Sequence, residues 1–414
     1  MSNLFIYILM NKIVSYLSLK NVGVIELLLA LTPILSGFRI AGLRFADLMW
    51  VILMLVSFLK FKYLPFRNNK PYMLFVLFWT FHELVIMNFF GSQMNIVGMF
   101  TFLLSFLSVF VLYPIIDIRK LEGALNWVVL ISIFGLLYQF QFVIRGIAIH
   151  PIEIPGLEMD ASRLENLLPR PSSFFMEPAA YGEYMLAPLS IALIRKKNLW
   201  AISIILSVFL TTSTTGLITV FIMLLIYILS QRTGTKNKFM VLIAGIGLIV
   251  SISQLSLFSS GIEKFETIDV KTNVRLAQGP SVLKSMNLGE IIVGTHYSTA
   301  YDYCIKANRA SNVVVYGDTV YLPTFYYMIL RFGIIGLLLY LNIYYRIYRK
   351  SSLTAPLIIC LILIMFSSPV ALSNTYFFTT IILLSIAYNS NYLLKFRTSP
   401  NCLTKNQKGN ANIF

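Results

Sequence analysis

The sequence predicts an all-α polytopic membrane protein with about twelve transmembrane helices, and three observations lead to this fold class. Of the 414 residues, 57% are hydrophobic and 12% are charged, whereas about a quarter of the residues in a soluble domain are charged. Apolar runs of roughly 18 residues, the length needed to cross a bilayer, recur along the whole chain. The basic residues, finally, gather in alternate connections between these runs. We therefore expect residues 1–414 to form a single polytopic membrane domain.

Window hydrophobicity locates the individual spans along the chain. The short pair at 199–231 leaves two interpretations open. The sequence LTTSTTG at 210–216 is either a tight turn between two spans or a polar kink in one long helix. The spans are expected near 22–38, 45–62, 71–90, 95–115, 121–144, 178–194, 199–212, 214–231, 238–257, 320–345, 354–372 and 375–394.

The basic residues indicate which connections face the cytoplasm. The even-numbered connections and the two termini carry 21 basic and 2 acidic residues, a net charge of +19, and the rest of the chain carries 12 basic and 15 acidic residues, a net charge of −3. Cytoplasmic segments are enriched in Lys and Arg, so we predict that both termini lie in the cytoplasm. The formal net charge of +16 is therefore a signal of topology and not of a nucleic-acid partner.

Two predicted connections are long, and both fall on the outer side of the membrane. They comprise residues 145–177 and 258–318. Connections of more than about 15 residues usually carry function or are disordered. Both segments mix charged, aromatic, Gly and Pro residues without repetition, so we expect ordered elements at the outer face.

The stretch RPSSFFMEPAAYGEY at 170–184 gathers ionisable residues at the outer end of the sixth span. Glu177 precedes Pro178, which suits the first turn of a helix, so Glu177 is either an N-cap or a carboxylate placed to take a proton from a hydroxyl. Glu183 lies inside the span, where a carboxylate is a functional hypothesis by default; the alternative is an interior polar plug. Arg170 is a partner for Glu183, a ligand for phosphate or an interfacial residue with a buried aliphatic stem.

The second long loop and the tenth span provide further candidates. Lys271 and Arg275 are basic residues in an outer region that is otherwise slightly acidic. They are either solvated surface groups or an anion site for a pyrophosphate-linked substrate. Asp318 is expected at the start of the tenth span, where it is an N-cap or a second candidate base. Arg331 falls in the outer half of that span, where an arginine is costly unless it faces a polar cavity or a partner.

Residue types that hold metals or cofactors are sparse. The three histidines, His82, His150 and His296, are scattered, and the acidic residues of the outer loops follow no metal-binding pattern. The three cysteines have no partner at a spacing typical of a disulfide or a zinc site. We therefore expect neither a metal nor a cofactor.

Two of these segments carry a family resemblance. RPSSFFMEPAAYGEYM at 170–185 resembles the Arg…Ser-Phe…Glu-Pro…(Phe/Tyr)-Gly signature of bacterial O-antigen and exopolysaccharide polymerases of the Wzy type. RFGIIGLLLYL at 331–341 resembles the late-span Gly-x-x-Gly segment of the same family. We interpret Gly333 and Gly336 in this segment as packing residues.

Other segments resemble the family with differences. RFADLMWVILML at 44–55 is similar to its second span, with an early Asp47. TTSTTGLITVFIMLL at 211–225 resembles a span that these polymerases share with O-antigen ligases, but Thr214 and Thr215 replace the usual Ser-Arg pair. The ligases often carry a histidine before the tenth-span equivalent, where this chain reads YGDTVY, which favours a polymerase.

The resemblance implies a membrane glycosyltransferase of the C superfamily, with its active site on the periplasmic face of the bacterial inner membrane. In that family the growing glycan on undecaprenyl pyrophosphate is transferred to a new lipid-linked repeat unit. The products are a chain longer by one unit and free lipid pyrophosphate. The implied partners are the lipid-linked oligosaccharides, membrane lipid and a polysaccharide chain-length regulator.

The candidate residues suit such a reaction. Glu177 is the first candidate for the base that activates the acceptor hydroxyl, and Asp318 is the second. Tyr181 is a candidate for stacking on sugars, although interfacial tyrosines also form aromatic belts. The leaving pyrophosphate is a stable anion that needs positive or polar donors, for which the candidates are Arg170, Arg275, Arg331, Lys271 and Arg163, with Glu183 beside them.

Two other functions compete with the polymerase. The first is an O-antigen ligase-like glycosyltransferase. The second is a lipid-linked oligosaccharide flippase or another transporter with twelve spans, whose two ends would also lie inside. Carriers built from two halves usually have a long inner connection between spans six and seven, but here that connection is the short RKKN at 195–198, which disfavours the transporter.

Overall fold

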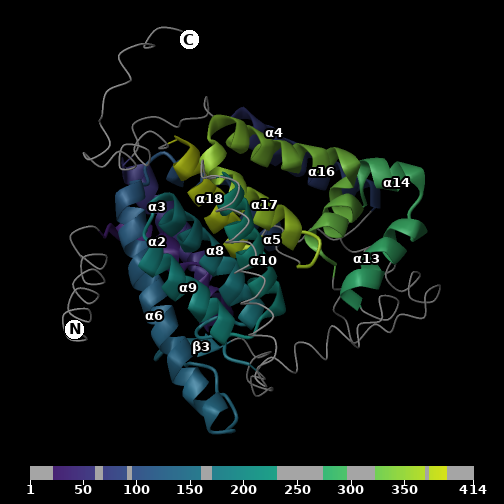
Figure 1. The fold of residues 1–414 in the computed structure, drawn as a ribbon. Helices are drawn as coiled ribbons and strands as arrows, with labels where there is room; N and C mark the ends of the chain where they lie inside the picture. Colours follow the sequence, from purple (N-terminus) through teal and green to yellow (C-terminus); the bar gives the residue numbers. More distant parts are fainter. Residues whose placement is uncertain are drawn as a thin grey trace, which may run out of the picture.

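A computed structural model describes residues 22–60, 69–90, 96–159, 170–230, 274–295, 322–368 and 373–388 of the chain. These residues form a mostly helical molecule (Figure 1). Two helices, α6 (Ile118–Ile144) and α16 (Thr324–Lys350), have 27 residues each and are apolar enough to cross a membrane, by length and composition. At about 1.5 Å per residue, α6 is longer than the ~30 Å hydrocarbon core of a bilayer, whereas α16 is interrupted at Gly333.

The other helices follow the apolar runs of the sequence. The helix α8 spans the residues expected for the sixth span, 178–194. The expected span at 238–257 lies outside the described residues, and the number of twelve spans stays a prediction. The remaining elements of the bundle are α2 (Val24–Leu31), α3 (Phe45–Lys60), α4 (Lys70–Phe90), α5 (Ile96–Leu112), α9 (Asn198–Leu210), α10 (Thr214–Ser230), α17 (Ala355–Ile364) and α18 (Asn374–Tyr388).

The expected first span, 22–38, is not one helix. The helix α2 ends at Leu31, a short 3-10 helix follows at Ile34–Gly37, and Phe38 begins a strand. Pro33 lies at the break, and because it has no N–H it cannot continue the hydrogen bonds of α2. A helix as short as α2 does not reach across a bilayer.

The polar stretch at 210–216 separates two helices, α9 and α10. Thr212 has a positive φ of 51°, which an α-helix does not contain. The Ser213 hydroxyl then accepts a hydrogen bond from the N–H of Gly216 (3.2 Å), as an N-cap residue does. The stretch is therefore a tight turn between two helices, and not a polar kink in one long helix.

A small antiparallel sheet joins the first long loop to the connection between α2 and α3. The strand β1 (Phe38–Ile40) lies between β2 (Leu43–Arg44) and β3 (Glu158–Met159). Arg39 is paired with Arg44 on one side and with Glu158 on the other. The sequence does not predict this sheet, because strands of two or three residues are too short to show an alternating pattern.

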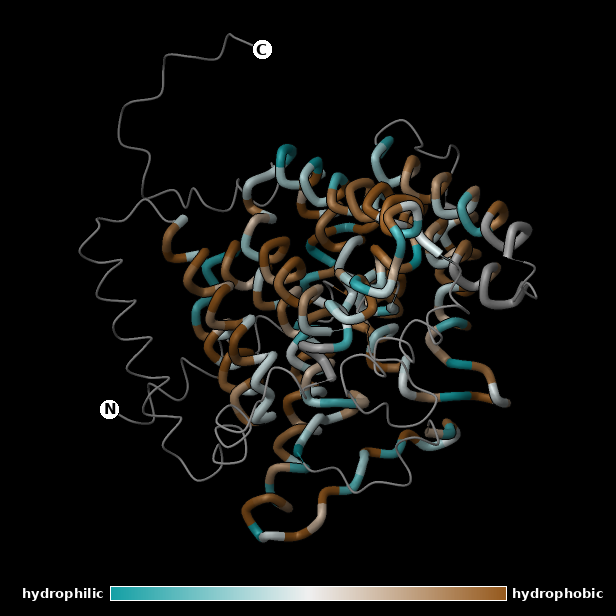
Figure 2. Tube along the Cα trace, turned by 90° about the vertical axis from the view of Figure 1, so that its right-hand side faces the viewer, coloured by the Kyte–Doolittle hydropathy of each residue, from teal (hydrophilic) through white to brown (hydrophobic). Residues whose placement is uncertain are grey.

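Two helices carry apolar faces that the rest of the described protein leaves exposed. On α6 these are Ile131, Phe134, Leu137 and Tyr138, each between 46% and 62% exposed. On α4, Leu74, Leu77, Phe81 and Leu84 form a second such stripe. In Figure 2 hydrophobic residues dominate the helices, and many hydrophilic ones lie at helix ends and in connections. Exposed apolar stripes of this size mark a contact with protein or membrane.

Contacts between helix ends bring together the connections that the sequence places in the cytoplasm. Glu122, near the start of α6, forms ion pairs with Arg195 (Nε–Oε2 3.2 Å) and Lys197 (Nζ–Oε1 2.5 Å), which follow α8. The Tyr227 hydroxyl of α10 donates to the carbonyl oxygen of Leu193 in the last turn of α8 (3.0 Å). The end of α8, the end of α10 and the start of α6 therefore lie at one end of the bundle.

The opposite end gathers connections that the sequence places outside. The indole N–H of Trp50 in α3 donates to Oδ1 of Asn374, the first residue of α18 (2.8 Å). Thr324, the first residue of α16, donates through its N–H (3.0 Å) and its hydroxyl (2.8 Å) to the carbonyl oxygen of Ser368, beyond α17. Two helices of the second long loop, α13 (Val274–Ser285) and α14 (Leu288–Val293), pack against α16 (Figure 1).

Candidate functional site

Residues 170–177, called the anchored segment here, are held against α6 by one buried glutamine. Oε1 of Gln139 accepts hydrogen bonds from the backbone N–H groups of Ser172 (2.9 Å) and Ser173 (2.7 Å). Its Nε2 donates to the carbonyl oxygen of His150 (3.1 Å) and, at 3.4 Å, to that of Ser173. A single side chain thereby fixes both described parts of the first long loop.

The packing of the anchored segment also depends on a glycine. Ser173 has a positive φ of 56°, and its hydroxyl donates to the carbonyl oxygen of Ser132 in α6 (2.8 Å). A Cβ atom on Gly135 would lie 2.6 Å from the Ser173 hydroxyl oxygen and 2.8 Å from the ring of Phe174. The segment can therefore approach α6 this closely only because Gly135 has no side chain.

Arg170 begins the anchored segment and reaches the turn between α9 and α10. Its Nη1 donates to the carbonyl oxygen of Thr212 (3.0 Å), the residue whose positive φ shapes that turn. The Arg170 side chain is half-buried, as an interfacial arginine or a phosphate ligand would be. This contact orients the guanidinium toward the turn between α9 and α10.

Glu177 ends the segment and serves as the N-cap residue of α8 by its backbone angles (φ −140°, ψ 152°). Its side chain forms no capping hydrogen bond and is exposed. Pro178 occupies the first turn of the helix, as expected. The carboxylate of Glu177 therefore faces the surroundings at a rigidly placed helix end, which a base for an incoming hydroxyl requires.

The other two candidates on α8 differ from Glu177 in burial. Glu183 is half-buried. Tyr181 is fully buried, and its ring packs edge-on against Phe175 at 5.4 Å between centroids. This position fits a role in packing and does not fit direct stacking on a glycan. Between them, Gly182 approaches Gly216 of α10 so closely that a Cβ atom would lie 2.8 Å from the Gly216 Cα.

Arg331 forms a second polar cluster, together with Glu83 of α4 and Tyr327 of α16. Its Nε lies 2.8 Å from Oε1 of Glu83, and the two side chains are only 11% and 6% exposed. Its Nη1 donates to the hydroxyl of Tyr327, one turn earlier in α16. Arg331 therefore faces a partner instead of an open cavity. The Cζ atom of its guanidinium lies 5.3 Å from the centroid of the Phe332 ring.

The Arg331 cluster lies at a break in α16. Gly333 has φ 65° and ψ −176°, a conformation open essentially to glycine alone. At this break, the carbonyl oxygen of Leu330 accepts hydrogen bonds from the N–H (2.8 Å) and the hydroxyl (3.0 Å) of Thr295, just after α14. A Cβ on Gly333 would lie 2.1 Å from the carbonyl oxygen of Ile292. Gly333 is thus needed for its backbone conformation as well as for packing.

His82 attaches α4 to the same region. Its Nε2 lies 2.8 Å from the carbonyl oxygen of Val293, the last residue of α14. The ring is buried and contacts Phe332 at 5.4 Å between centroids. The second long loop is therefore fixed to α4 and α16 through His82, Thr295 and the break at Gly333.

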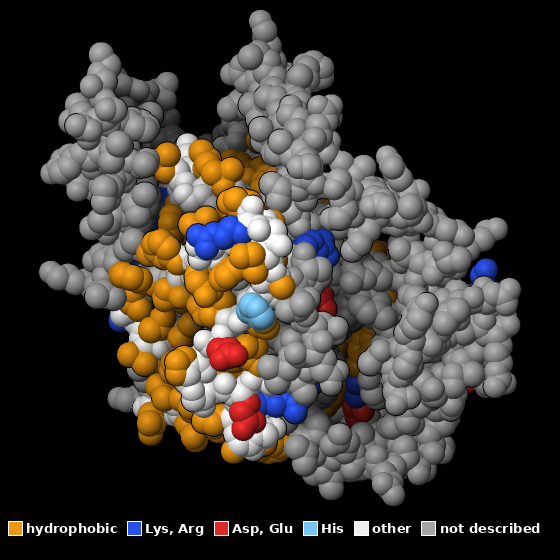
Figure 3. Space-filling view, turned by 90° about the horizontal axis from the view of Figure 1, so that it is seen from below, with side chains coloured by type: hydrophobic (Ala, Val, Ile, Leu, Met, Phe, Trp, Pro, Cys, Tyr) orange, Lys and Arg blue, Asp and Glu red, His pale blue; other side chains and the backbone are white. Residues whose placement is uncertain are grey.

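The anchored segment and the Arg331 cluster lie toward the same end of the bundle. Arg170 contacts the start of α10, and α10 packs along α17, where the Cys360 thiol approaches the carbonyl oxygen of Thr219 (3.3 Å). Ser368, just beyond α17, in turn accepts a hydrogen bond from Thr324 at the start of α16. Figure 3 shows the molecule from below, where hydrophobic side chains cover much of the described surface and a few basic and acidic groups lie among them.

Several predicted residues cannot be placed. Arg163, Lys271 and Asp318 lie outside the described residues. Arg275 belongs to α13, but its side chain is not among those described. Within the part of the chain that the structure describes, no group of three His, Cys, Asp or Glu residues could hold a metal ion.

Three residues of these sites were missed by the sequence analysis. Glu83 and His82 are adjacent polar residues in an otherwise apolar span, FWTFHELVIM at 78–87. An ionisable residue at membrane depth is itself a signal of function or pairing, so this pair could have been found. Gln139 lies near the end of another apolar span, and no local pattern distinguishes it from a surface glutamine.

Comparison of the chain with models of protein families finds no match. Comparison with curated proteins also finds no match.

Proposed function

We propose that this protein is a polysaccharide polymerase of the bacterial inner membrane, a glycosyltransferase with about twelve spans and the architecture of the C superfamily. It would transfer a growing glycan from undecaprenyl pyrophosphate to a new lipid-linked repeat unit at the periplasmic face, without a metal. Lipid-linked oligosaccharides are its substrates, and a chain-length regulator is a candidate partner. The resemblance of residues 170–185 to the polymerase signature suggests this reaction.

The observation that carries the proposal is the way in which hydrogen bonds hold the anchored segment against α6. Gln139 of α6 accepts two of its backbone N–H groups, and the Ser132 carbonyl oxygen of α6 accepts the hydroxyl of Ser173. Arg170 is oriented at one end of it, and Glu177 is exposed at the other. A buried glutamine that satisfies two backbone N–H groups keeps such a segment rigid. An arginine and a carboxylate set a few residues apart on a rigid support are the groups that a glycosyl transfer to a hydroxyl needs.

In the proposed reaction the acceptor hydroxyl oxygen attacks the anomeric carbon of the donor glycan. The bond from that carbon to the pyrophosphate oxygen breaks, and the bonding electrons leave with the pyrophosphate. Glu177 takes the proton of the hydroxyl. Arg170 stabilises the negative charge that develops on the leaving group. Arg331 already has Glu83 as its counter-ion, so we assign it to positioning of the second long loop and not to the pyrophosphate.

The test is a gel of surface polysaccharide from cells that lack the gene and from cells complemented with variants. The deletion should leave lipid anchors capped with a single repeat unit, and Arg170→Ala and Glu177→Gln should fail to restore the ladder. Arg44→Ala and Glu153→Gln remove the same charges from exposed residues of the outer connections and should restore it. The amount of each variant in the membrane is measured in parallel.

The gel also separates the alternatives. If the deletion yields no capped anchor at all, the defect lies in flipping or ligation, and the polymerase proposal falls. If Glu177→Gln restores a full ladder, Glu177 is only a helix cap. Arg170→Lys keeps the charge but loses the planar fork, so partial activity of this variant would support contact with pyrophosphate.

A further inference from the structure

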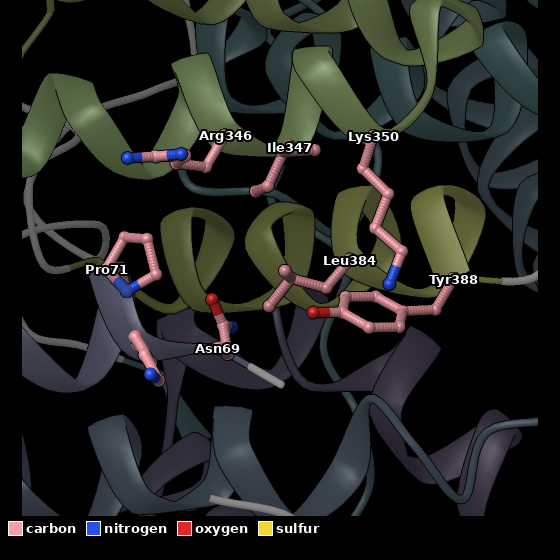
Figure 4. Close-up of a pocket in the computed structure, with 8 residues that line it drawn as sticks. Asn69, Pro71, Arg346, Ile347, Lys350, Leu384 and Tyr388 are labelled. Atoms are coloured by element: carbon pink, nitrogen blue, oxygen red, sulfur yellow. The ribbon is translucent and has the colours of Figure 1, made fainter. Parts of the chain in front are cut away.

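A cavity of about 400 Å³ lies at the end of the bundle that the sequence assigns to the cytoplasm. The helix α4 begins there, and α16 and α18 end there (Figure 4). Protein cavities that hold small molecules usually measure about 300–1,000 Å³, so this cavity is large enough for a ligand. The residues that line it include Asn69, Lys70, Arg346, Ile347, Lys350 and Tyr388.

The cavity has a strongly positive lining. Lys70, Arg346 and Lys350 line it, and among the residues that the structure describes no acidic one does. Within the described part of the chain, none of the three forms an ion pair with a carboxylate. The Nζ of Lys350 lies 2.9 Å from the centroid of the Tyr388 ring, and Figure 4 shows the lysine side chain extending from α16 to that ring. Such a contact orients an ammonium group and leaves its charge in place.

Asn69 is an independent sign that the cavity holds a polar ligand. It directly precedes α4, and only 5% of it is exposed. Its side-chain Nδ2 is buried and has no hydrogen-bond partner among the described residues. Figure 4 shows the side chain pointing from the start of α4 toward α16 and α18. Buried amide donors are almost always satisfied, so an acceptor is expected in the cavity.

We propose that this cavity binds a phosphate group, with the headgroup of an anionic phospholipid as its source. Phosphate oxygens accept hydrogen bonds from lysine, arginine and amide donors, and the start of α4 favours an anion through its helix dipole. Ile347 and Leu384 supply an apolar wall beside which an acyl chain can lie. Basic pockets between membrane helices at the cytoplasmic side bind such headgroups, and anionic lipids are abundant in that leaflet.

The site is separate from the proposed active site. The anchored segment lies at the opposite end of the bundle, and none of its residues lines the cavity. A lipid bound here would connect α4, α16 and α18. Because α4 and α16 also carry Glu83 and Arg331, the lipid would stabilise the helix pair that holds the second long loop.

The test measures lipid binding to the full-length protein in detergent by native mass spectrometry. Phosphatidylglycerol should bind saturably, and zwitterionic phosphatidylcholine should bind much more weakly. A single Lys or Arg contributes a factor of about five to the binding of anionic lipid, so Arg346→Gln and Lys350→Gln should each weaken binding about fivefold. Arg349→Gln is the matched control, because it removes the same charge from the neighbouring residue, which does not line the cavity.

A third variant, Asn69→Leu, tests the buried amide. It should weaken binding of phosphatidylglycerol without lowering the thermal stability of the lipid-free protein, because the lost amide donor has no partner there. Inorganic phosphate is added in competition to identify the source of the phosphate group. If phosphate alone displaces the lipid at equal concentration, the ligand is a soluble phosphate and the lipid source is wrong.

Two results would overturn the site itself. One is the absence of saturable binding by both phosphatidylglycerol and inorganic phosphate. The other is an equal loss of affinity in Lys350→Gln and Arg349→Gln, which would reduce the effect to general surface charge. Neither result bears on polymerisation, because the polysaccharide gel tests residues of the anchored segment, which lies at the opposite end of the bundle.

Discussion

The buried pair of Arg331 and Glu83 gives the sharpest prediction about stability. We consider Glu83→Leu, Arg331→Met and the double variant. Each single change leaves one charge buried without its counter-ion, which costs about 3–5 kcal/mol of the free energy of unfolding. The double change leaves an apolar pair of similar size in contact with Phe332, and buried ion pairs replaced in this way are often close to neutral. We therefore expect the double variant to be more stable than either single variant.

The magnitude follows from the geometry. Two unit charges 2.8 Å apart, the distance between Nε of Arg331 and Oε1 of Glu83, attract each other by about 6 kcal/mol at an effective dielectric constant of about 20. Desolvation of both side chains offsets much of this energy in the native protein. The coupling energy from the double-mutant cycle should therefore be at least about 3 kcal/mol, which is toward the upper end of measured couplings.

The assay is reversible unfolding in mixed micelles of detergent and SDS, followed by tryptophan fluorescence. Trp79 is fully buried in α4, four residues before Glu83, and reports on the relevant helix pair. The control Glu153→Leu removes an exposed carboxylate and should change the unfolding free energy by less than about 0.5 kcal/mol.

An additive result would refute the reasoning. If the cost of the double variant equals the sum of the single costs within about 0.5 kcal/mol, the two groups do not depend on each other. The same variants also inform on catalysis. A double variant that is stable and polymerises glycan supports the positioning role of Arg331, whereas one that is stable and inactive assigns Arg331 to the substrate.

Three further substitutions test the backbone features of the candidate site. Gly333→Ala should prevent α14 from docking and lower the thermal stability, whereas Gly146→Ala, at the same φ of 65° with open space around it, should have a smaller effect; equal effects would show that φ strain alone matters. Gln139→Leu leaves two backbone N–H groups unsatisfied, at about 1–3 kcal/mol each, and protease cleavage within residues 145–177 should increase; unchanged cleavage would contradict the anchoring role. Gly182→Val should separate α8 from α10 and destabilise the protein in the same micelle assay, and full stability would exclude their close contact.

The helical elements could largely be predicted from the sequence. The bounds of α8 agree with the expected span, and those of α3, α4 and α5 agree within a few residues. This succeeds because hydrophobicity over a span is a local property that any stretch of chain displays by itself. The exceptions are also local in origin, since Pro33 divides the first expected span and Ser213 caps the helix after the turn at 210–216.

The candidate site was predicted only in part. The sequence located Glu177 through its position beside Pro178 and Arg170 as an ionisable residue of the stretch 170–184, and the structure places them at the two ends of the anchored segment. It also suggested a role for Tyr181 at a glycan, but that ring is buried beside Phe175. Whether a tyrosine at a helix end faces outward depends on the neighbouring helices, which the local sequence does not specify.

By itself, the sequence determined that this is a mostly helical, strongly apolar chain with its basic residues in alternate connections. Only the tertiary structure decided which polar residues meet. Arg331 and Glu83 are separated by 248 positions, and Gln139 binds Ser172 across 33. Apolar periodicity reports where a helix lies, but it carries no information about which two helices become neighbours. The pairing is decided when buried polar groups must find partners in the packed protein, because unpaired they would cost more than folding gains.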